Sequence, residues 1–287
     1  MLPLSLVEIT NVTAVKSGNT LFQNFNWRIK EGEHWFITGA NGAGKTVLLE
    51  MLAGIVNAPH GEINFNFIEG NSWEDRYWDR RRKIKFIPAH AVQSLVKNSP
   101  DVYYQQRYYG SDEENVFRVR DILGDDLNNL DALHIPSSFS IEHLLDVEVT
   151  RLSNGQLKKI LLVQSLVTHR PRMLLLDYPF EGLDHVSREE LSHFIDFIAT
   201  TYNVQIILVD QHHHLPSVMN RKLTLDQFKI TGQETIEPGH TGLTDFKIHA
   251  GSSSLSIPVV EMKDLTIQYG DTIIIKDFNW RIHQGER

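Results

Sequence analysis

The stretch "GANGAGKT" (39–46) decides the fold, because its glycine, lysine and threonine spacing matches G-x-x-x-x-G-K-[ST] at every fixed position. Small residues in such a loop let backbone N–H groups close around phosphate oxygens. In this pattern the lysine reaches the β- and γ-phosphates, and the threonine hydroxyl binds Mg²⁺. The candidate phosphate-binding residues are Gly39, Ala40, Asn41, Gly42, Ala43, Gly44, Lys45 and Thr46.

The sequence on either side of this loop has the order that the motif requires. "HWFIT" (34–38) is typical of a buried strand, and "KTVLLEMLAG" (45–54) spaces its apolar residues as a helix does, with Gly54 as a stop signal. The loop therefore lies at a helix N-terminus, where the helix dipole favours an anion. A glycine-rich turn that binds no ligand is the alternative, and this context disfavours it.

A second group of motifs lies at 151–184, in "RLSNGQLKKILLVQSLVTHRPRMLLLDYPFEGLD". Ser153 and Gly155 stand where a helix begins, so we expect their hydroxyl and N–H groups to form a second anion site. An ordinary capping serine beside a glycine is the alternative, and it would be preferred if this stretch stood alone. Asp177 ends an apolar strand. Together with 39–46, this order resembles the ATP-binding-cassette (ABC) ATPases, in which an LSGGQ signature, a Walker B aspartate and a D-loop follow the phosphate-binding loop (P-loop).

The resemblance implies a fold, a set of cofactors and a site. The implied fold is α/β, a P-loop NTPase of ABC type with a RecA-like core sheet, an antiparallel β subdomain and an α-helical signature subdomain. The implied cofactors are ATP and Mg²⁺, with Thr46 and Asp177 as metal ligands. In this family each ATP is held by the P-loop of one cassette and the signature of another. Ser153, Gly155 and Gln156 would therefore contact a nucleotide bound by a partner cassette.

The chain repeats its own beginning. "NFNWRIKEGE" starts at Asn24 and "DFNWRIHQGE" starts at Asp277, an offset of 253 residues. Such a repeat indicates two copies of one domain in the natural protein. We expect an ABC nucleotide-binding domain at 1–235, a linker at 236–257 and the truncated start of a second ABC domain at 258–287. Paired cassettes, a short linker and "LLLD-P-F-GLD" make the chain resemble the molybdenum-transport/photorepair (ModF-like) ATP-binding proteins.

Two departures from the family pattern affect the catalytic groups. Tyr178 stands where the family has a catalytic glutamate. A phenol keeps its proton at neutral pH, so it cannot act as the base for an attacking water. The switch position is normally a histidine, and strand register places it at Gln211, with His212 one residue later as the alternative.

Two further departures affect nucleotide binding and coupling. Ala89 stands where a glutamine usually follows the proline, and Lys16 stands at the position of an adenine-stacking aromatic residue, which the second copy offers as Tyr269. Stacking of a base on an aromatic ring is worth ~1–3 kcal/mol, so we expect weaker adenine binding here unless another ring compensates. The pattern predicts a site that binds Mg-ATP with weak or no intrinsic hydrolysis, while the second site borrows Ser153 and Gly155.

Composition bounds the remaining options. A chain of 287 residues can form one large domain, or one domain and part of another. The net charge of −8 argues against generic adhesion to nucleic acid or acidic lipid. Cysteine is absent, which excludes disulfides and thiolate-bound zinc, and no apolar run approaches the ~20 residues that span a bilayer. We expect a cytoplasmic protein, either dissolved or peripheral to a membrane.

Two classes of function remain open. The first is a tandem ABC ATPase whose closure on ATP does work on a partner, with molybdate-type transport through a separate membrane permease as one role. Its nucleotide-binding partner would be the second ABC domain of the same chain, or a second copy of this chain. The alternative is a nucleotide-gated binding module for nucleic acid, a ribosome or a protein complex. A GTPase is disfavoured because the chain lacks an N-K-x-D guanine motif.

Overall fold

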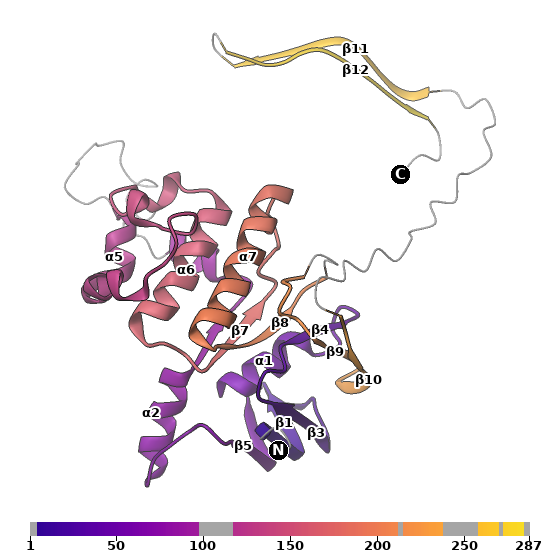
Figure 1. The fold of residues 1–287 in the computed structure, drawn as a ribbon. Helices are drawn as coiled ribbons and strands as arrows, with labels where there is room; N and C mark the ends of the chain where they lie inside the picture. Colours follow the sequence, from indigo (N-terminus) through magenta and orange to yellow (C-terminus); the bar gives the residue numbers. More distant parts are fainter. Residues whose placement is uncertain (1–4, 98–116, 212–214, 238–257, 270–271, 284–287) are drawn as a thin grey trace. The chain divides into compact units, whose positions relative to one another are not determined.

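The computed structural model describes residues 5–97, 117–211, 215–237, 258–269 and 272–283. The chain divides into two compact units, Met1–Gly242 and Leu243–Arg287, each of which is described by itself. In Figure 1 the first unit contains sheets and helices, and the second unit contains one long hairpin.

A six-stranded sheet forms the centre of the first unit, in the order β10-β9-β4-β8-β7-β6. The neighbours from β9 to β6 are parallel, and β10 pairs antiparallel with β9 at the edge. Because β4, β8 and β7 are parallel neighbours, the residues that follow them meet at one edge of the sheet. The strands are β4 (Trp35–Gly39), β6 (Ile84–Ile87), β7 (Met173–Asp177), β8 (Gln205–Val209), β9 (Arg221–Asp226) and β10 (Lys229–Thr235).

The inner strands of this sheet are apolar on both faces. Every residue of "MLLLD" in β7 and "QIILV" in β8 is buried. Leu174 and Leu176 pack into one hydrophobic cluster, whereas Met173 and Leu175 pack into another. This alternation follows from the two-residue period of a strand, and continuous apolar runs are typical of parallel strands covered on both sides.

An antiparallel sheet lies against one of these clusters. Its strands are β1 (Ser5–Lys16), β2 (Asn19–Thr20), β3 (Phe25–Lys30) and β5 (Asn57–Phe65), and β1 pairs with each of the other three. Helix α1 (Lys45–Ala53) contributes Leu48, Leu49 and Leu52 to the cluster that both sheets share. Gly54 ends α1 in a left-handed conformation, with its N–H bonded to the carbonyl oxygens of Glu50 and Met51, as the sequence predicts.

Helices cover the opposite face of the central sheet. Their cluster includes Phe194 and Ile160, both fully buried. Helices α6 and α7 lie side by side there (Figure 1). The elements are α3 (Ala91–Lys97), α5 (Val119–Leu123), α6 (Asn154–Thr168), α7 (His185–Tyr202) and short 3₁₀ turns at Gly124–Asn129, Asp131–Leu133, Glu142–Leu144 and Val149–Arg151.

None of the residues of helix α2 (Trp73–Lys83) is buried. Within the described part of the chain, no helix has the length and apolar character needed to cross a membrane. The predicted α/β fold is confirmed, with its parallel core sheet, antiparallel β subdomain and helical subdomain.

The second unit is an antiparallel hairpin of β11 (Pro258–Tyr269) and β12 (Thr272–His283). Its register repeats that of β1 and β3 at the offset of 253 residues. The matching pairs are Val7↔Ile29 and Val260↔Ile282, Glu8↔Arg28 and Glu261↔Arg281, Ile9↔Trp27 and Met262↔Trp280, and Val12↔Phe25 and Leu265↔Phe278. Most of the predicted linker, 238–257, lies outside the described residues.

The local geometry of the two hairpins also repeats. The Asn11 N–H donates to the Asn26 side chain, and the Asp264 N–H donates to Asn279. Both Asn11 and Asp264 have positive φ, at 51° and 49°. Burial differs, because Trp27 is 3% exposed and its counterpart Trp280 is 49% exposed. The second hairpin therefore has the pairing of the first without an equivalent cover over its apolar side chains among the described residues.

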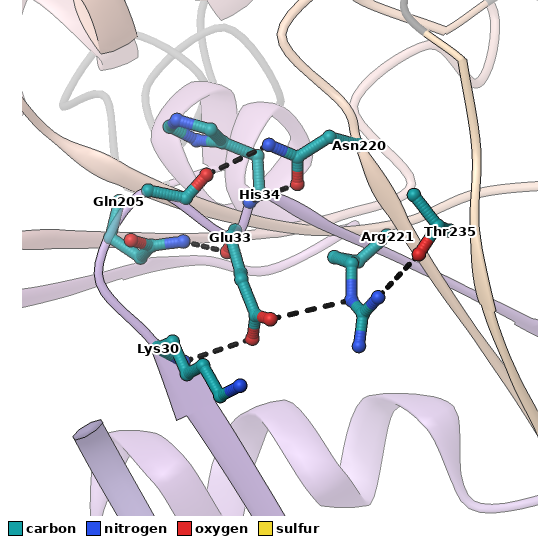
Figure 2. A network of polar contacts seen from close by, with 8 residues as sticks. Lys30, Glu33, His34, Gln205, Asn220, Arg221 and Thr235 are labelled. Atoms are coloured by element: carbon teal, nitrogen blue, oxygen red, sulfur yellow. Dashed lines mark hydrogen bonds and ion pairs between the residues drawn. The ribbon is translucent and has the colours of Figure 1, made fainter. Parts of the chain in front are cut away.

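A polar network joins the N-terminal ends of β4, β8 and β9 (Figure 2). The His34 imidazole Nδ1 accepts the Ile206 N–H at 3.1 Å, and the Asn220 side chain accepts the His34 N–H at 3.0 Å. Burial lowers the pKa of His34 to about 4, against a smaller opposing effect of Asp196. The His34 imidazole is therefore neutral in the folded protein at neutral pH.

Glu33 extends this network to the edge of the sheet (Figure 2). Its carboxylate accepts the Lys30 N–H at 2.9 Å and forms an ion pair with Arg221. The Gln205 side chain donates to the Glu33 carbonyl oxygen, and Arg221 donates to the Thr235 hydroxyl. These bonds tie the strands together at the end opposite the P-loop.

Candidate functional site

The P-loop follows β4 and leads directly into α1, as the sequence predicts. Gly39 has a φ of +142°, and a Cβ there would lie 2.1 Å from the Leu225 carbonyl oxygen. Gly44 has a φ of +99°, and a Cβ there would lie 2.5 Å from the Phe228 ring. Both positions require glycine, because a side chain would have to displace β9 or the turn that follows it.

The Lys45 side chain is held inside the loop. It is 4% exposed, and its ammonium group donates to the carbonyl oxygens of Gly39 and Ala40, each at 2.8 Å. These carbonyl groups hold the Lys45 ammonium at the N-terminus of α1, where the free backbone N–H groups of the helix also point. A buried cation beside a helix N-terminus is suited to a phosphate group.

Asp177 lies at the end of β7 beside the first turn of α1. The Thr46 hydroxyl donates to its two carboxylate oxygens at 3.1 and 3.0 Å. Burial raises the pKa of Asp177, while hydrogen bonds from Thr46 and the Ala89 backbone oppose that rise. A hydroxyl and a buried carboxylate fit a hard divalent cation, which prefers oxygen ligands and would offset the buried charge. Thr46 and Asp177 are therefore the residues that would hold Mg²⁺.

Tyr178 occupies an unusual backbone conformation, with a φ of +50°. Its N–H donates to the Val209 carbonyl oxygen at 2.8 Å, which ties the residue after β7 to the last residue of β8. The Lys45 ammonium lies 5.9 Å from the centre of its ring. A bulky residue in this region is rare, so the surrounding bonds must stabilise it.

Lys158 of α6 provides much of this support, although it belongs to none of the motifs in the sequence. Its ammonium group donates to the carbonyl oxygens of Tyr178, Pro179 and Glu181, at 3.3, 2.7 and 2.7 Å. Burial lowers the pKa of Lys158, and the charges of Asp210 and Glu181 oppose that effect. The only sequence signal was its place on the helix that starts at the signature.

A polar cavity of about 290 Å³ lies beside the P-loop. Its lining residues come from the P-loop and from the segments that follow β7 and β8, namely Asn41, Tyr178, Glu181, Asp210 and Gln211. The Gln211 side chain donates to the Asn41 side chain at 2.9 Å, so the predicted switch residue reaches the P-loop. His212, the alternative for that position, lies outside the described residues.

The signature residues form the start of α6. The Ser153 hydroxyl accepts the Gln156 N–H at 3.2 Å, and the Gln156 side chain accepts the Ser153 N–H at 2.9 Å. Gly155 leaves room for Ser187 of α7, because a Cβ there would lie 3.1 Å from that side chain. Ser153 is exposed, and its hydroxyl proton can still be donated to an anion.

Lys16, at the position of the adenine-stacking aromatic residue, forms an ion pair of its own. Its ammonium group pairs with the Glu50 carboxylate of α1 at 2.5 Å. The rings of Phe22 and Phe228 lie against Gly44 of the P-loop and meet edge to face, with centres 5.5 Å apart. Phe22 is fully buried, so its ring supports the loop and does not face solvent.

This geometry defines a nucleotide-binding P-loop protein, and comparison gives its family. The ABC transporter model matches residues 22–181, which is more than half of the chain. The chain belongs to the ABC transporter ATP-binding family, whose cofactors are ATP and Mg²⁺. The predicted ABC resemblance and cofactors are thereby confirmed.

The chain is similar to three proteins in particular. An ABC transporter ATP-binding protein of Schizosaccharomyces pombe is 27% identical over 300 residues, covering 99% of this chain and 60% of that protein. ModF of Escherichia coli is 28% identical over 223 residues, covering 72% of this chain and 41% of ModF. A dimeric ATP-binding cassette, solved after hydrolysis with ADP and phosphate, has a TM-score of 0.54 at 23% identity, covering 80% and 98%. The chain thus spans less than two thirds of either of the first two proteins.

Proposed function

We propose that this chain binds Mg-ATP at its own P-loop, hydrolyses it slowly, and forms the degenerate half of a tandem ABC ATPase. One observation carries the proposal. Thr46 and Asp177 are joined by hydrogen bonds and Lys45 is in place, yet the residue after Asp177 is a tyrosine. Loss of a general base typically lowers a rate by ~10²–10⁴-fold without preventing binding.

The repeated hairpin supports a tandem arrangement. β11 and β12 copy the register and the positive-φ positions of β1 and β3. The S. pombe protein aligns with 99% of this chain, so the likeness extends over the second hairpin. The domain boundaries that we propose are 1–235 and 258 onward, joined by a linker at 236–257.

The signature supports a nucleotide site shared between two cassettes. Ser153 is exposed at the tip of α6, and a cavity of about 200 Å³ lies beside it, lined by residues of α6 and α7. We propose that Ser153, Gly155 and Gln156 complete the ATP site of the second domain, or of a second copy. Because the chain is similar to ModF, the first function that we propose to test is molybdate-type transport. The partner in that function would be a separate membrane permease, which the chain would bind at the cytoplasmic face of the membrane.

Restoring the carboxylate tests the degenerate site. Tyr178→Glu should raise single-turnover ATP hydrolysis by at least ~10²-fold, whereas Tyr178→Phe should leave it unchanged. Lys45→Ala should abolish ATP binding, which shows that the nucleotide occupies this P-loop. A wild-type rate that Tyr178→Glu does not increase would contradict the proposal of a degenerate site.

The shared signature needs a test in the full-length tandem protein. Ser153→Arg should block hydrolysis at the second site and leave ATP affinity at this P-loop unchanged. A Glu74→Arg variant on the exposed face of α2 is the control for added positive charge. Equal loss of ATP binding at both sites would contradict the assignment of Ser153 to the other nucleotide.

One observation favours the alternative of a nucleotide-gated binding module. On α2, Trp73 is 76% exposed and Trp78 is 57% exposed, and Trp73 stacks on Tyr77 with ring centres 5.3 Å apart. Exposed aromatic residues beside arginines are common in binding surfaces. Capture under ATP-trapping conditions separates the two functions, because a permease, a ribosome and a nucleic acid differ in composition. Loss of capture in Trp73→Ala/Trp78→Ala would favour the binding module.

A further inference from the structure

Tyr178 stands where the family has a catalytic glutamate, but two other residues that line the polar cavity beside the P-loop carry carboxylates. They belong to Asp210 and Glu181. Asp210 is 1% exposed and accepts the N–H groups of Phe180 and Gln211, at 3.2 and 2.7 Å. Its oxygens are committed to holding the backbone, so Asp210 is poorly placed to take a proton from water.

Glu181 is placed differently. It is exposed where it lines the cavity, and Lys158 holds its backbone carbonyl oxygen at 2.7 Å. That bond fixes the backbone of Glu181 at the edge of the cavity and does not engage its carboxylate. Asn41 and Gln211 line the same cavity and are hydrogen-bonded to each other. Glu181 therefore lines the same polar cavity as a P-loop residue and the proposed switch residue.

We propose that Glu181 acts as the general base for the residual ATP hydrolysis at this site, an inference that rests on the proposed function. The water transfers a proton to the Glu181 carboxylate as its oxygen bonds to the γ-phosphorus. The bond from the γ-phosphorus to the β,γ-bridging oxygen breaks, which leaves ADP and inorganic phosphate, and Glu181 then releases the proton to solvent. A carboxylate three positions after Tyr178 replaces the missing group because the backbone turn brings both residues to one cavity.

Single-turnover hydrolysis by the 287-residue chain tests this role. Glu181→Gln should lower the residual rate by at least ~10-fold relative to wild type, and Glu74→Gln on α2 is the control that should not change it. In a Tyr178→Glu background, Glu181→Gln should have little effect, because the restored carboxylate then takes the proton. An unchanged rate in Glu181→Gln would overturn the role of Glu181 and leave the degenerate ATP site standing.

A binding measurement tests the position of Glu181 without relying on activity. A carboxylate near the γ-phosphate repels it, so Glu181→Gln should bind a non-hydrolysable ATP analogue several-fold more tightly than wild type and bind ADP equally. Equal affinities for the analogue in the variant and in wild type would overturn the proposal. Loss of both ligands would instead count against the ATP site itself, and thermal unfolding of the variant distinguishes that from failure to fold.

Discussion

Thr46 and Asp177, separated by 131 positions in the sequence, are joined by a bifurcated hydrogen bond of 3.0 and 3.1 Å. The contact links the helix after the P-loop to the end of β7. The two oxygen groups that would bind Mg²⁺ are thus brought together by the fold itself. Little reorganisation is then needed when the cation arrives, which favours binding.

This contact predicts opposite effects of Asp177→Asn on binding and on stability. The variant should weaken Mg²⁺-dependent ATP binding by ~10-fold or more, because an amide is a poorer ligand for a hard cation. It should leave the ligand-free protein as stable or more stable, because burial raises the pKa of the carboxyl and so penalises its charged form. Isothermal titration with and without Mg²⁺ and thermal unfolding check both effects. Equal losses with and without Mg²⁺ would contradict the assignment.

Two glycines with positive φ should respond differently to alanine. Gly39→Ala should lower the free energy of unfolding by ~4 kcal/mol or more, because its Cβ would meet the Leu225 carbonyl oxygen. Gly18→Ala is the matched control, with a φ of +78° and no atom within 4 Å, and should cost only ~1–2 kcal/mol. Chemical denaturation measures both, and similar losses would show that the contact with β9 is unimportant.

His34 predicts a dependence of stability on pH. Its pKa is about 4 in the folded protein and about 6.5 when unfolded, so between these values the unfolded chain binds more protons. Its contribution to stability is present above pH 6.5 and is lost as the pH falls toward 4, by no more than ~3 kcal/mol. Denaturation from pH 7 to 4.5 should show a shallower decline for His34→Gln than for wild type. Parallel curves would contradict this role for His34.

Lys158 should control the mobility of the segment after β7. Lys158→Met removes bonds to three carbonyl oxygens and should cost ~1.5–3 kcal/mol, with faster hydrogen exchange at Phe180. Lys159→Met is the neighbouring control, since its single backbone bond goes to Ser138. Exchange that accelerates equally in both variants would point to loosening of α6 as a whole.

The sequence predicts the fold well wherever local pattern and packing agree. The loop at 39–46 and Gly54 specify a strand, a turn and a helix through backbone requirements that few residues satisfy. The unbroken apolar run in β7 indicates burial on both faces. The exact repeat of hairpin register could not be read from sequence, because register depends on the bulges at Asn11 and Asp264.

The site was predictable only where chemistry depends on a motif. Lys45 and Thr46 belong to a pattern that fixes their place. Lys158 and Glu181 do not, because their contacts depend on the approach of α6 to the turn after β7. The ion pair of Lys16 with Glu50 could not be predicted from the sequence either, because the two residues belong to different elements that come together only in the folded protein.

The shared register of the two hairpins has a consequence for how the chain assembles. Because the two registers match, β12 has the hydrogen-bonding pattern that β1 needs, and β3 has the pattern that β11 needs. Pairing of β1 with β12, or of β11 with β3, would give a strand-swapped structure. Exchange must close a loop that spans the whole first unit, whereas correct pairing closes only a short turn. Synthesis from the N-terminus also completes the first hairpin before the second exists. The order of synthesis therefore favours pairing of β1 with β3, a pairing that the strand register alone does not determine.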